Sequence, residues 1–413
     1  MSREAAKGTA LGTKPELSVA MIGAGFMGAA HSKAWREAAR VADLPASPKR
    51  TVLVGRDADR AAAAAARLDW EESSDDWRSV VERDDIDLVD ICTPGASHAE
   101  IAIAALEAGK HVLCEKPLAN TVAEAERMAG AARAAAADGV VAMVGFSYRR
   151  VPALRYAREL IGRGRIGTVR QARAAYLQDW LSNPDAPMTW RLDRASAGSG
   201  ALGDIGAHAI DTLEYLTGST FASASGLLHT FTPERPLMAE SVGLGGRAAA
   251  DAERAPVTVD DLALATARLA DGAIASIEAS RVATGRKNAL RIEISGTAGA
   301  VAFDLERLNE IELYDATGPG PEQGFRRIVV TEPEHPWLGM WWPAGHVLGW
   351  DHAFIHQAVD LVTDIAAGRP PEPSFEDGLH IQRVLDAIDR SAASGGAWTR
   401  VEPTEADDQQ GDD

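Results

Sequence analysis

The strongest constraint on this chain is a regular alternation of apolar and helix-like segments between residues 17 and 145. Five apolar runs are typical of buried strands: LSVAMIG, TVLVG, IDLVDICT, KHVLCE and VVAMVG. Helical segments separate them, among them ADRAAAAAARL and TVAEAERMAGAARAAAA. Apolar strands separated by helices are what a parallel sheet covered on both faces requires. We therefore predict a doubly wound α/β nucleotide-binding domain at residues 16–146.

Two helices of this region carry the sequence pattern of a capping box. The pairs are Ser97 with Glu100 and Thr121 with Glu124. In such a box, the hydroxyl and the carboxylate satisfy backbone N–H groups that the first helical turn leaves free. Both pairs therefore predict where a helix begins.

The pattern changes near residue 146, and residues 147–400 are predicted to form a second, α+β domain. Turn signals at Asp271-Gly272 and Gly296-Thr297 separate apolar runs that are typical of antiparallel strands. We therefore predict a large, mostly antiparallel sheet with a few helices. The strand-like runs include LALATARLADG, AIASIEASRV, ALRIEISGT, GAVAFDL and EIELYDA, and helices are expected at residues 351–365 and 375–394.

Composition argues against several classes of partner. The 60 acidic residues exceed the 42 basic ones, and the formal net charge of −18 repels nucleic acid. No apolar run reaches the length of a membrane span, and no apolar segment typical of a signal peptide begins the chain. Only Cys92 and Cys114 occur, both in apolar runs, which indicates a reducing, cytoplasmic compartment. The polar ends, residues 1–15 and 401–413, are predicted to be disordered tails.

A glycine-rich loop with the pattern GxGxxG joins the first strand to the first helix; its members are Gly23, Gly25, Phe26, Met27 and Gly28. Gly23 permits a tight turn, Gly25 lets a pyrophosphate approach the backbone, and Gly28 packs helix on strand. The pattern alone is weak evidence, because 38 glycines supply many similar turns. Its position between a strand and a helix supports binding of a dinucleotide.

The residues after the second strand bear on which nicotinamide cofactor is used. They are Gly55, Arg56 and Asp57. Arg56 could stack on adenine or pair with a phosphate of NADP, whereas Asp57 could reach the ribose of NAD. Arg56 also fits a solvated turn. NAD and NADP therefore both remain open.

Three further strand ends carry polar or unusual residues: Thr93 with Pro94, Glu115 with Lys116, and Tyr148 with Arg149. In open α/β sheets, ligands bind outside the carboxyl ends of the strands, so all three should border the cofactor crevice. Lys116 is the most notable, because a partly buried ammonium there can hold a substrate hydroxyl and stabilise alkoxide charge. A surface lysine after a strand is the plainer alternative.

The segment SGALGDIGAHAIDTLEYLTG places polar groups along one predicted helical stripe. Asp204, His208, Asp211 and Tyr215 fall at positions i, i+4, i+7 and i+11. A histidine beside a carboxylate is suited to taking a hydroxyl proton near neutral pH. The alternative is a core histidine satisfied by Asp204 or Asp211, and the stripe alone does not separate the two.

Four motifs in this order resemble the Gfo/Idh/MocA family (glucose–fructose oxidoreductase, inositol dehydrogenase, rhizopine catabolism). They are GAGFMGAAH, CTPGASH, EKPLA and GDIGAH, and they span both predicted domains. The segments YLQDW, SGALGDI and ERPL make the chain most similar to members that act on anhydrosugars and related glycosides. The chain departs from the usual family pattern at Gly95 and Ser147.

This resemblance implies a catalytic set of Lys116, Asp204 and His208. In the family pattern, His208 would accept the hydroxyl proton, Asp204 would orient His208 and the substrate, and Lys116 would anchor the reacting hydroxyl. Residues implied to line the cofactor are Thr93, Pro94, His98 and Glu115. The resemblance also implies pairing into homodimers or homotetramers through the open face of the second-domain sheet.

Two other groups of residues invite a functional interpretation. Aromatic and hydrogen-bonding side chains that suit a sugar, and equally suit a tryptophan-rich packing edge, are Gln178, Asp179, Trp180, Trp190 and Arg191. A possible metal site at His346, Asp351, His352 and His356 is disfavoured, because neighbouring tryptophans indicate a packed loop and no carboxylate pattern matches. We therefore expect no metal.

The function that these observations favour is oxidation of a sugar or polyol hydroxyl by a nicotinamide cofactor. Two alternatives share the fold: an NAD-dependent glycosidase that oxidises its sugar transiently, and a non-catalytic nucleotide-sensing regulator. A regulator needs no proton acceptor, so an intact set of lysine, aspartate and histidine argues against it.

Overall fold

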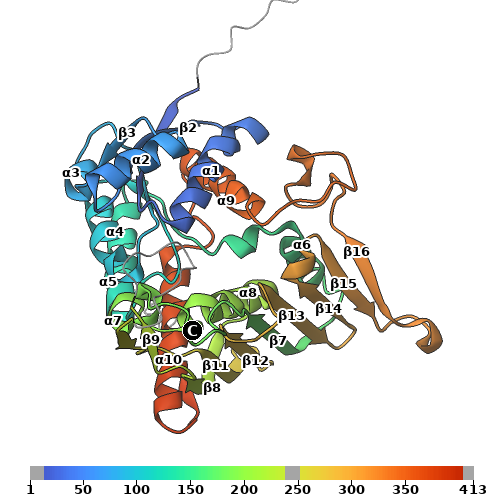
Figure 1. Ribbon diagram of the computed structural model, residues 1–413. Helices are drawn as coiled ribbons and strands as arrows, with labels where there is room; N and C mark the ends of the chain where they lie inside the picture. The colour runs from blue at the N-terminus through green and yellow to red at the C-terminus, as the bar shows by residue number, and fades with distance from the viewer. Residues whose placement is uncertain (1–13, 238–251, 403–413) are drawn as a thin grey trace, which may run out of the picture.

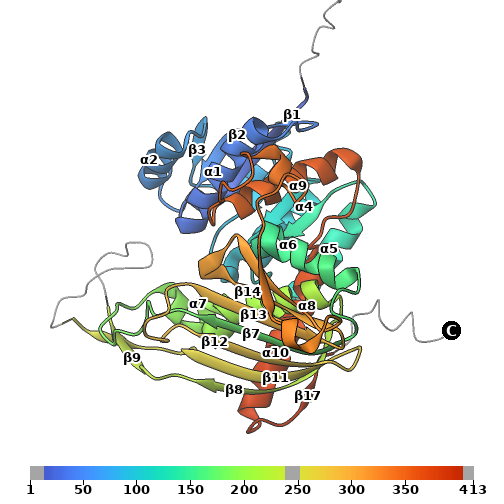
Figure 2. The ribbon, with the colours of Figure 1, turned by 90° about the vertical axis from the view of Figure 1, so that its right-hand side faces the viewer.

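The computed structural model describes residues 14–237 and 252–402 (Figures 1 and 2), so the two predicted tails lie almost entirely outside the described residues. Two β-sheets organise the chain, with the smaller above the larger in Figure 2. The smaller sheet has the strand order β3-β2-β1-β4-β5-β6, and all of its pairs are parallel. Its strands are β1 (Glu16–Ile22), β2 (Ser47–Val54), β3 (Glu72–Ser74), β4 (Leu88–Ile91), β5 (His111–Cys114) and β6 (Ala142–Val144).

The smaller sheet confirms the predicted doubly wound domain and adds one strand to it. The additional strand, β3, is short and largely exposed, and its residues Glu-Ser-Ser lack the apolar run that marks a buried strand. The strand order reverses between β1 and β4, so their carboxyl ends frame the crevice in which sheets of this kind bind ligands.

Helices cover both faces of this sheet. The helices supplied by the same part of the chain are α1 (Phe26–Val41), α2 (Ala58–Leu68), α3 (Trp77–Val81), α4 (His98–Glu107) and α5 (Val122–Ala136). The capping box at Thr121 and Glu124 is present at the start of α5. The one predicted at Ser97 and Glu100 is wrong. A 3-10 turn, η1 (Gly95–Ser97), precedes α4; Ser97 donates to the Pro94 carbonyl at 2.9 Å, and Glu100 pairs with Arg78.

The larger sheet confirms the predicted, mostly antiparallel second domain. Its strand order is β16-β15-β14-β13-β7-β12-β11-β8-β17, and only β7 and β12 pair in parallel. The predicted turns at Asp271-Gly272 and Gly296-Thr297 connect β11 to β12 and β13 to β14. The strands are β7 (Val169–Leu177), β8 (Phe221–His229), β11 (Leu262–Leu269), β12 (Ile274–Ser280), β13 (Ala289–Gly296), β14 (Gly299–Asp304), β15 (Glu310–Asp315), β16 (Phe325–Val329) and β17 (Thr399–Arg400). A separate two-stranded ribbon pairs β9 (Glu234–Pro236) with β10 (Arg254–Pro256).

The two faces of the larger sheet differ. One face packs on α8 (Ala207–Thr217) and α6 (Pro152–Gly162), and residues of β11 that point to it, such as Ala263 and Ala267, are buried. The alternate residues of the same strand, such as Leu264, point to the other face and are exposed. That open face forms a broad hollow of about 1130 Å³.

The last two helices bring the chain back to the nucleotide-binding domain. In both views α9 (His352–Ala367) lies beside α1 (Figures 1 and 2). Its Phe354 and Ile355 share one buried cluster with Leu113 of β5 and Met143 of β6. The helix that follows, α10 (Phe375–Ala393), packs against β8 and α5 and so touches both domains. Within the described residues, no helix is long and apolar enough to cross a membrane.

Candidate active site

The glycine-rich loop between β1 and α1 has the geometry of a phosphate-binding turn. Gly23 has a φ of +111°, and a Cβ there would lie 2.6 Å from the Cys92 carbonyl oxygen. A Cβ on Gly28 would lie 2.0 Å from the Gly23 carbonyl oxygen, so both positions require glycine. Gly25 has no atom within 4 Å of an added Cβ, and no side chain caps α1. The first amides of α1 therefore face open space beside Gly25, which fits a pyrophosphate.

The other residues predicted to bind the cofactor are partly exposed and partly buried. Thr93 and Pro94 follow β4, and Arg56 is exposed after β2, where Asp57 caps α2. His98 is 1 % exposed and lies beneath the surface, within 2.9 Å of the Thr93 carbonyl and 3.1 Å of the Pro117 carbonyl. His98 thus holds the loops after β4 and β5 together. Phe26, by contrast, is half exposed and stacks on Trp350 with ring centroids 5.5 Å apart.

Lys116 and Asp204 meet where the carboxyl end of β5 faces the second domain. Lys116 Nζ donates to the Asp204 backbone carbonyl and lies 3.6 Å from its carboxylate Oδ1. A second cation, Arg281, lies 3.6 Å from Oδ2. Burial raises the pKa of Asp204, but Lys116, Arg281 and Arg191 together hold it below the usual aspartate value. The carboxylate is therefore ionised in a largely buried place.

His208 lies in an aromatic box rather than against a carboxylate. It is 8 % exposed, and its ring centroid lies 4.5 Å from Tyr148 and 6.1 Å from both Phe146 and Tyr176. Its buried Nδ1 has no hydrogen-bond partner among residues 14–237 and 252–402. Burial, and then the charge of Lys116, hold the pKa of His208 well below 6.5. The imidazole is neutral near pH 7 and can accept a proton.

The predicted polar stripe is therefore wrong as a single helical face. The π-helical turn η4 (Leu202–Gly206) precedes α8, so Asp204 and His208 are not on one regular helix. Asp211 accepts from Arg149 at 2.6 Å in a buried ion pair, and burial raises the pKa of Asp211 to about 6 although Arg149 opposes the shift. π-Helical turns occur frequently at functional sites, but sequence periodicity does not reveal them.

A chain of hydrogen bonds begins at Tyr148, whose ring contacts that of His208, and we call the residues that it joins the wall of the site. The Tyr148 hydroxyl lies 2.7 Å from that of Tyr176, which donates to Asn288 Oδ1 at 2.8 Å. Gln178 Nε2 donates to the same oxygen at 2.8 Å and its own Oε1 accepts from Trp180 at 3.1 Å. The wall therefore combines aromatic faces with fixed donors and acceptors.

Not every predicted substrate residue joins this wall. Arg149 is committed to Asp211, and Asp179 accepts from Lys287 at 2.7 Å on the rim. The guanidinium of Arg191 stacks over the Trp190 ring, 4.4 Å from its centroid. Its positive charge contributes to lowering the pKa of Asp204. The structure thus brings Tyr148, Gln178, Trp180 and Arg191 near the catalytic candidates but directs Arg149 elsewhere. Sequence analysis did not name Asn288 or Arg281, and it used Tyr176 only as part of the segment YLQDW and not as a site residue.

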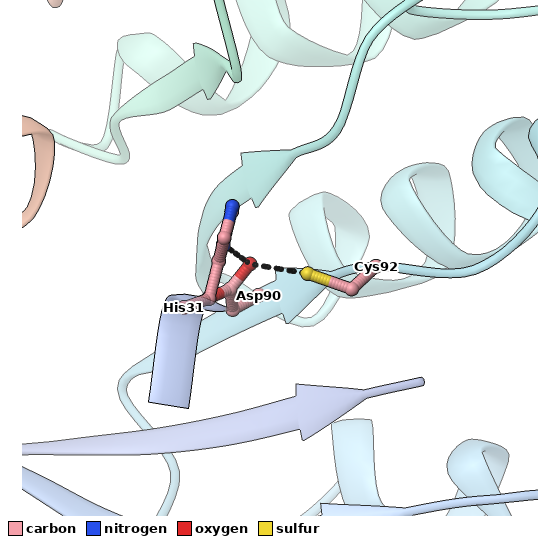
Figure 3. Close-up of side chains that lie close together, drawn as sticks. All are labelled: His31, Asp90 and Cys92. Atoms are coloured by element: carbon pink, nitrogen blue, oxygen red, sulfur yellow. Dashed lines mark hydrogen bonds and ion pairs between the residues drawn. The ribbon is translucent and has the colours of Figure 1, made fainter. Parts of the chain in front are cut away.

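A second buried charge cluster lies directly behind Lys116. His31 Nδ1 lies 3.0 Å from the carboxylate of Asp90, and its Nε2 lies 3.0 Å from Glu115 Oε1. Burial lowers the pKa of His31, but Asp90 overcomes this and holds it well above 6.5. Figure 3 shows His31 and Cys92 on either side of Asp90, with the Cys92 thiol 3.6 Å from Asp90 Oδ1. Glu115 therefore has a partner on its buried side.

Within the described residues, the group of side chains close enough to hold a metal ion is His31, Asp90 and Cys92. Each of its ligand atoms already takes part in a hydrogen bond, and burial raises the pKa of the Cys92 thiol. In the group near residue 350 that the sequence disfavours as a metal site, both ring nitrogens of His356 are used in hydrogen bonds. His356 is buried, accepts from Trp341 at 2.7 Å, and has its pKa lowered to about 3 by burial.

Comparisons with known proteins identify the family and the fold. Residues 17–146 match the oxidoreductase family with an NAD-binding Rossmann fold, and residues 154–302 match the GFO/IDH/MocA C-terminal domain. The levoglucosan dehydrogenase of Pseudarthrobacter phenanthrenivorans is 42% identical over 388 residues, which is 93% of this chain and 98% of that protein. A crystal structure of an oxidoreductase domain protein from Kribbella flavida has a TM-score of 0.89 and 57% identity, covering 94% of this chain and 100% of that one. A structure of levoglucosan dehydrogenase with NADH has a TM-score of 0.88 and 41% identity over 94% and 100% of the two chains.

Proposed function

Because this chain belongs to the GFO/IDH/MocA family of NAD-binding oxidoreductases, we propose that it oxidises a secondary hydroxyl of a sugar or polyol. The observation that carries the proposal is the contact of Lys116 with Asp204, near a neutral His208 whose Nδ1 has no partner among the described residues. When bound beside the glycine-rich loop, the nicotinamide cofactor supplies the hydride acceptor.

The three side chains divide the work at the reacting hydroxyl. His208 accepts the hydroxyl proton, because its low pKa keeps the imidazole unprotonated. Lys116 donates a hydrogen bond to the same oxygen and stabilises the negative charge that develops as the proton leaves. Asp204 orients Lys116, since its carboxylate and its carbonyl both face the ammonium.

The side chains in the wall of the site suit a pyranose-like substrate, such as an anhydrosugar or a glycoside, or an inositol. Tyr148, Tyr176, Asn288 and Gln178 form a continuous line of hydrogen bonds, which can exchange partners with several neighbouring hydroxyls. The Trp180 ring offers an apolar face for the C–H groups of a sugar ring. Relatives named for levoglucosan and inositol are consistent with this class.

A dehydrogenase screen over inositols, aldoses, anhydrosugars and glycosides, with NAD and NADP separately, tests the proposal. We expect growth of absorbance from reduced cofactor, and a loss of kcat/KM of about 10²- to 10⁴-fold in His208→Ala, which removes the proton acceptor. His346→Ala, at an exposed histidine, is the control. Full activity in His208→Ala would contradict the assignment, and cleavage of nitrophenyl glycosides without net reduction would favour the glycosidase.

The same proposal includes a homodimer or homotetramer in the cytoplasm. The open face of the larger sheet presents exposed Leu227 and Leu264 beside its hollow, as an interface between copies requires. Both cysteines, Cys92 and Cys114, are free thiols, which suits a reducing compartment. Light scattering on the purified protein measures the assembly; a monomer at micromolar concentration would contradict this part.

A further inference from the structure

Arg281 is a buried cation that the proposed mechanism does not use. It follows β12, and its side chain is 0% exposed. One guanidinium nitrogen, Nη1, lies 3.6 Å from Oδ2 of Asp204, whereas Lys116 Nζ lies 3.6 Å from Oδ1. Each oxygen of the carboxylate therefore has a cation of its own.

Arg281 also holds the backbone that carries its neighbours. Nη1 donates to the Arg191 carbonyl at 3.3 Å, and Nη2 donates to the Asp260 carbonyl at 2.9 Å. Asp260 in turn accepts from the amides of Gly200 at 2.7 Å and Leu202 at 2.8 Å, where the π-helical turn of Asp204 begins. A planar guanidinium bound at two points has little freedom to rotate. Arg281 is thus locked relative to the segment that presents Asp204.

The two cations on Asp204 differ in what substrate binding does to them. Lys116 is proposed to turn its ammonium toward the substrate hydroxyl, so its attraction to Asp204 is shared during the reaction. Arg281 cannot turn in this way, because two backbone carbonyls and a Trp180 ring 5.7 Å away enclose it. A largely buried carboxylate that lost its partner cation would tend to take up a proton. Arg281 is the partner that stays.

We propose that Arg281 is a positioning residue that keeps Asp204 charged and fixed while Lys116 engages the substrate. The proposal rests on the proposed function, since it gives Asp204 a part in the reaction. Arg281 itself does not touch the reacting atoms. It acts through Asp204 and through the Arg191 carbonyl.

Two variants separate its charge from its shape. In Arg281→Gln, we expect kcat/KM to fall about 10²-fold, as when a reacting group is misplaced. Loss of one cation also raises the pKa of Asp204, which still faces Lys116 and Arg191. The acid limb of the activity profile should therefore move up by about one pH unit or more. Arg281→Lys keeps the charge and should shift the limb less, but it should raise KM because both carbonyl contacts cannot be kept.

Arg235 supplies the matched control. It is also fully buried, and its guanidinium donates to the carbonyls of Leu181 at 2.9 Å and Asn183 at 2.8 Å. Arg235→Gln should lower the melting temperature but leave the acid limb where the wild type has it. An Arg281→Gln variant with an unchanged acid limb would overturn the proposal.

A thermal double-mutant cycle tests the pair without using activity. Melting temperatures are compared for Arg281→Gln, Asp204→Asn and the double variant. If the two groups act together, the double variant loses less than the sum of the single losses, whereas the cycle of Arg235→Gln with Asp204→Asn is additive. Additive losses for Arg281 and Asp204 would overturn the proposal. Failure of every sugar to reduce cofactor contradicts the proposed function instead, and leaves this cycle measurable.

Discussion

Two charge clusters meet at the adjacent residues Glu115 and Lys116, and the signs of their charges are reversed. In the rear cluster, the cation His31 lies between the anions Asp90 and Glu115. In the front cluster, the anion Asp204 lies among the cations Lys116, Arg281 and Arg191. Glu115 and Lys116, which are adjacent at the end of β5, thus belong to two clusters: one has a cation between anions, and the other has an anion among cations.

The clusters also differ in how completely their groups are bonded. Both ring nitrogens of His31 face carboxylates, and Trp35 donates to Asp90 at 2.7 Å, so the rear cluster has little capacity for a ligand. The front cluster is open: the Asp204 side chain is 29% exposed, and His208 Nδ1 is unpartnered among the described residues. The fully hydrogen-bonded rear cluster fixes the end of β5, whereas the front cluster keeps groups free to bind a ligand.

Removing the negative charge at the centre of the front cluster should have the largest effect on activity. Asp204→Asn removes the anion on which the cations converge, so Lys116 is no longer held toward the crevice. We expect kcat/KM to fall at least about 100-fold. Steady-state reduction of NAD measures it, with Glu100→Gln, at an exposed carboxylate of α4, as the control. A loss below threefold would mean that Asp204 is not part of the reaction.

Breaking the rear cluster should cost stability first. His31→Gln leaves Asp90 and Glu115 buried without their shared cation, and removal of one partner of a buried pair costs about 3–5 kcal/mol of unfolding free energy. Urea unfolding followed by tryptophan fluorescence measures the loss. His352→Gln, at a partly exposed histidine on α9, should change the unfolding free energy far less.

The pH dependence of that loss follows from the direction of the shift. The pKa of His31 is raised in the folded state, so its contribution is complete below about pH 6.5 and is lost as pH rises through the raised value. The difference between wild type and His31→Gln should therefore shrink as the pH is raised toward 10. A difference that stays constant from pH 6 to 10 would show that His31 is neutral.

Removal of metal should have the smallest effect. His31, Asp90 and Cys92 have the proximity of a metal site, but their ligand atoms are used in hydrogen bonds. Dialysis against a chelator should leave both kcat/KM and melting temperature unchanged. Activity that is lost in the chelator and restored by zinc would contradict the claim that these three side chains hold hydrogen bonds and not a metal ion.

The comparison also separates what could be predicted from the sequence. Local patterns predicted the strands, the glycine loop and the box at Thr121, because each depends on residues a few positions apart. The box at Ser97 failed because a 3-10 turn redirects its hydroxyl. The front cluster is different. Its members, and those of the wall of the site, are far apart in the sequence: Arg281 lies 77 positions from Asp204, and Asn288 lies 112 positions from Tyr176.

Arg149 is a predicted site residue whose contacts could not be read from the sequence. Its place after a strand end predicted contact with a ligand, yet it meets Asp211 in a buried ion pair. Arg149 reaches Asp211 because the chain folds back so that the 3-10 turn of residues 147–150 lies against α8, 62 positions further along the sequence. Neither periodicity nor motif spacing contains that information.

The return of α9 to the first sheet bears on how the chain folds during synthesis. Phe354 and Ile355 of α9 pack in one buried cluster with Leu113 of β5 and Met143 of β6. Until α9 leaves the ribosome, only α1 and α2 contribute helical residues to this cluster, and the part of the surface that Phe354 and Ile355 cover stays open. An mRNA truncated after the dinucleotide-binding region would thus encode a sheet with an exposed apolar patch where α9 normally packs. Such a fragment would tend to aggregate and would not serve as a portable cofactor-binding module.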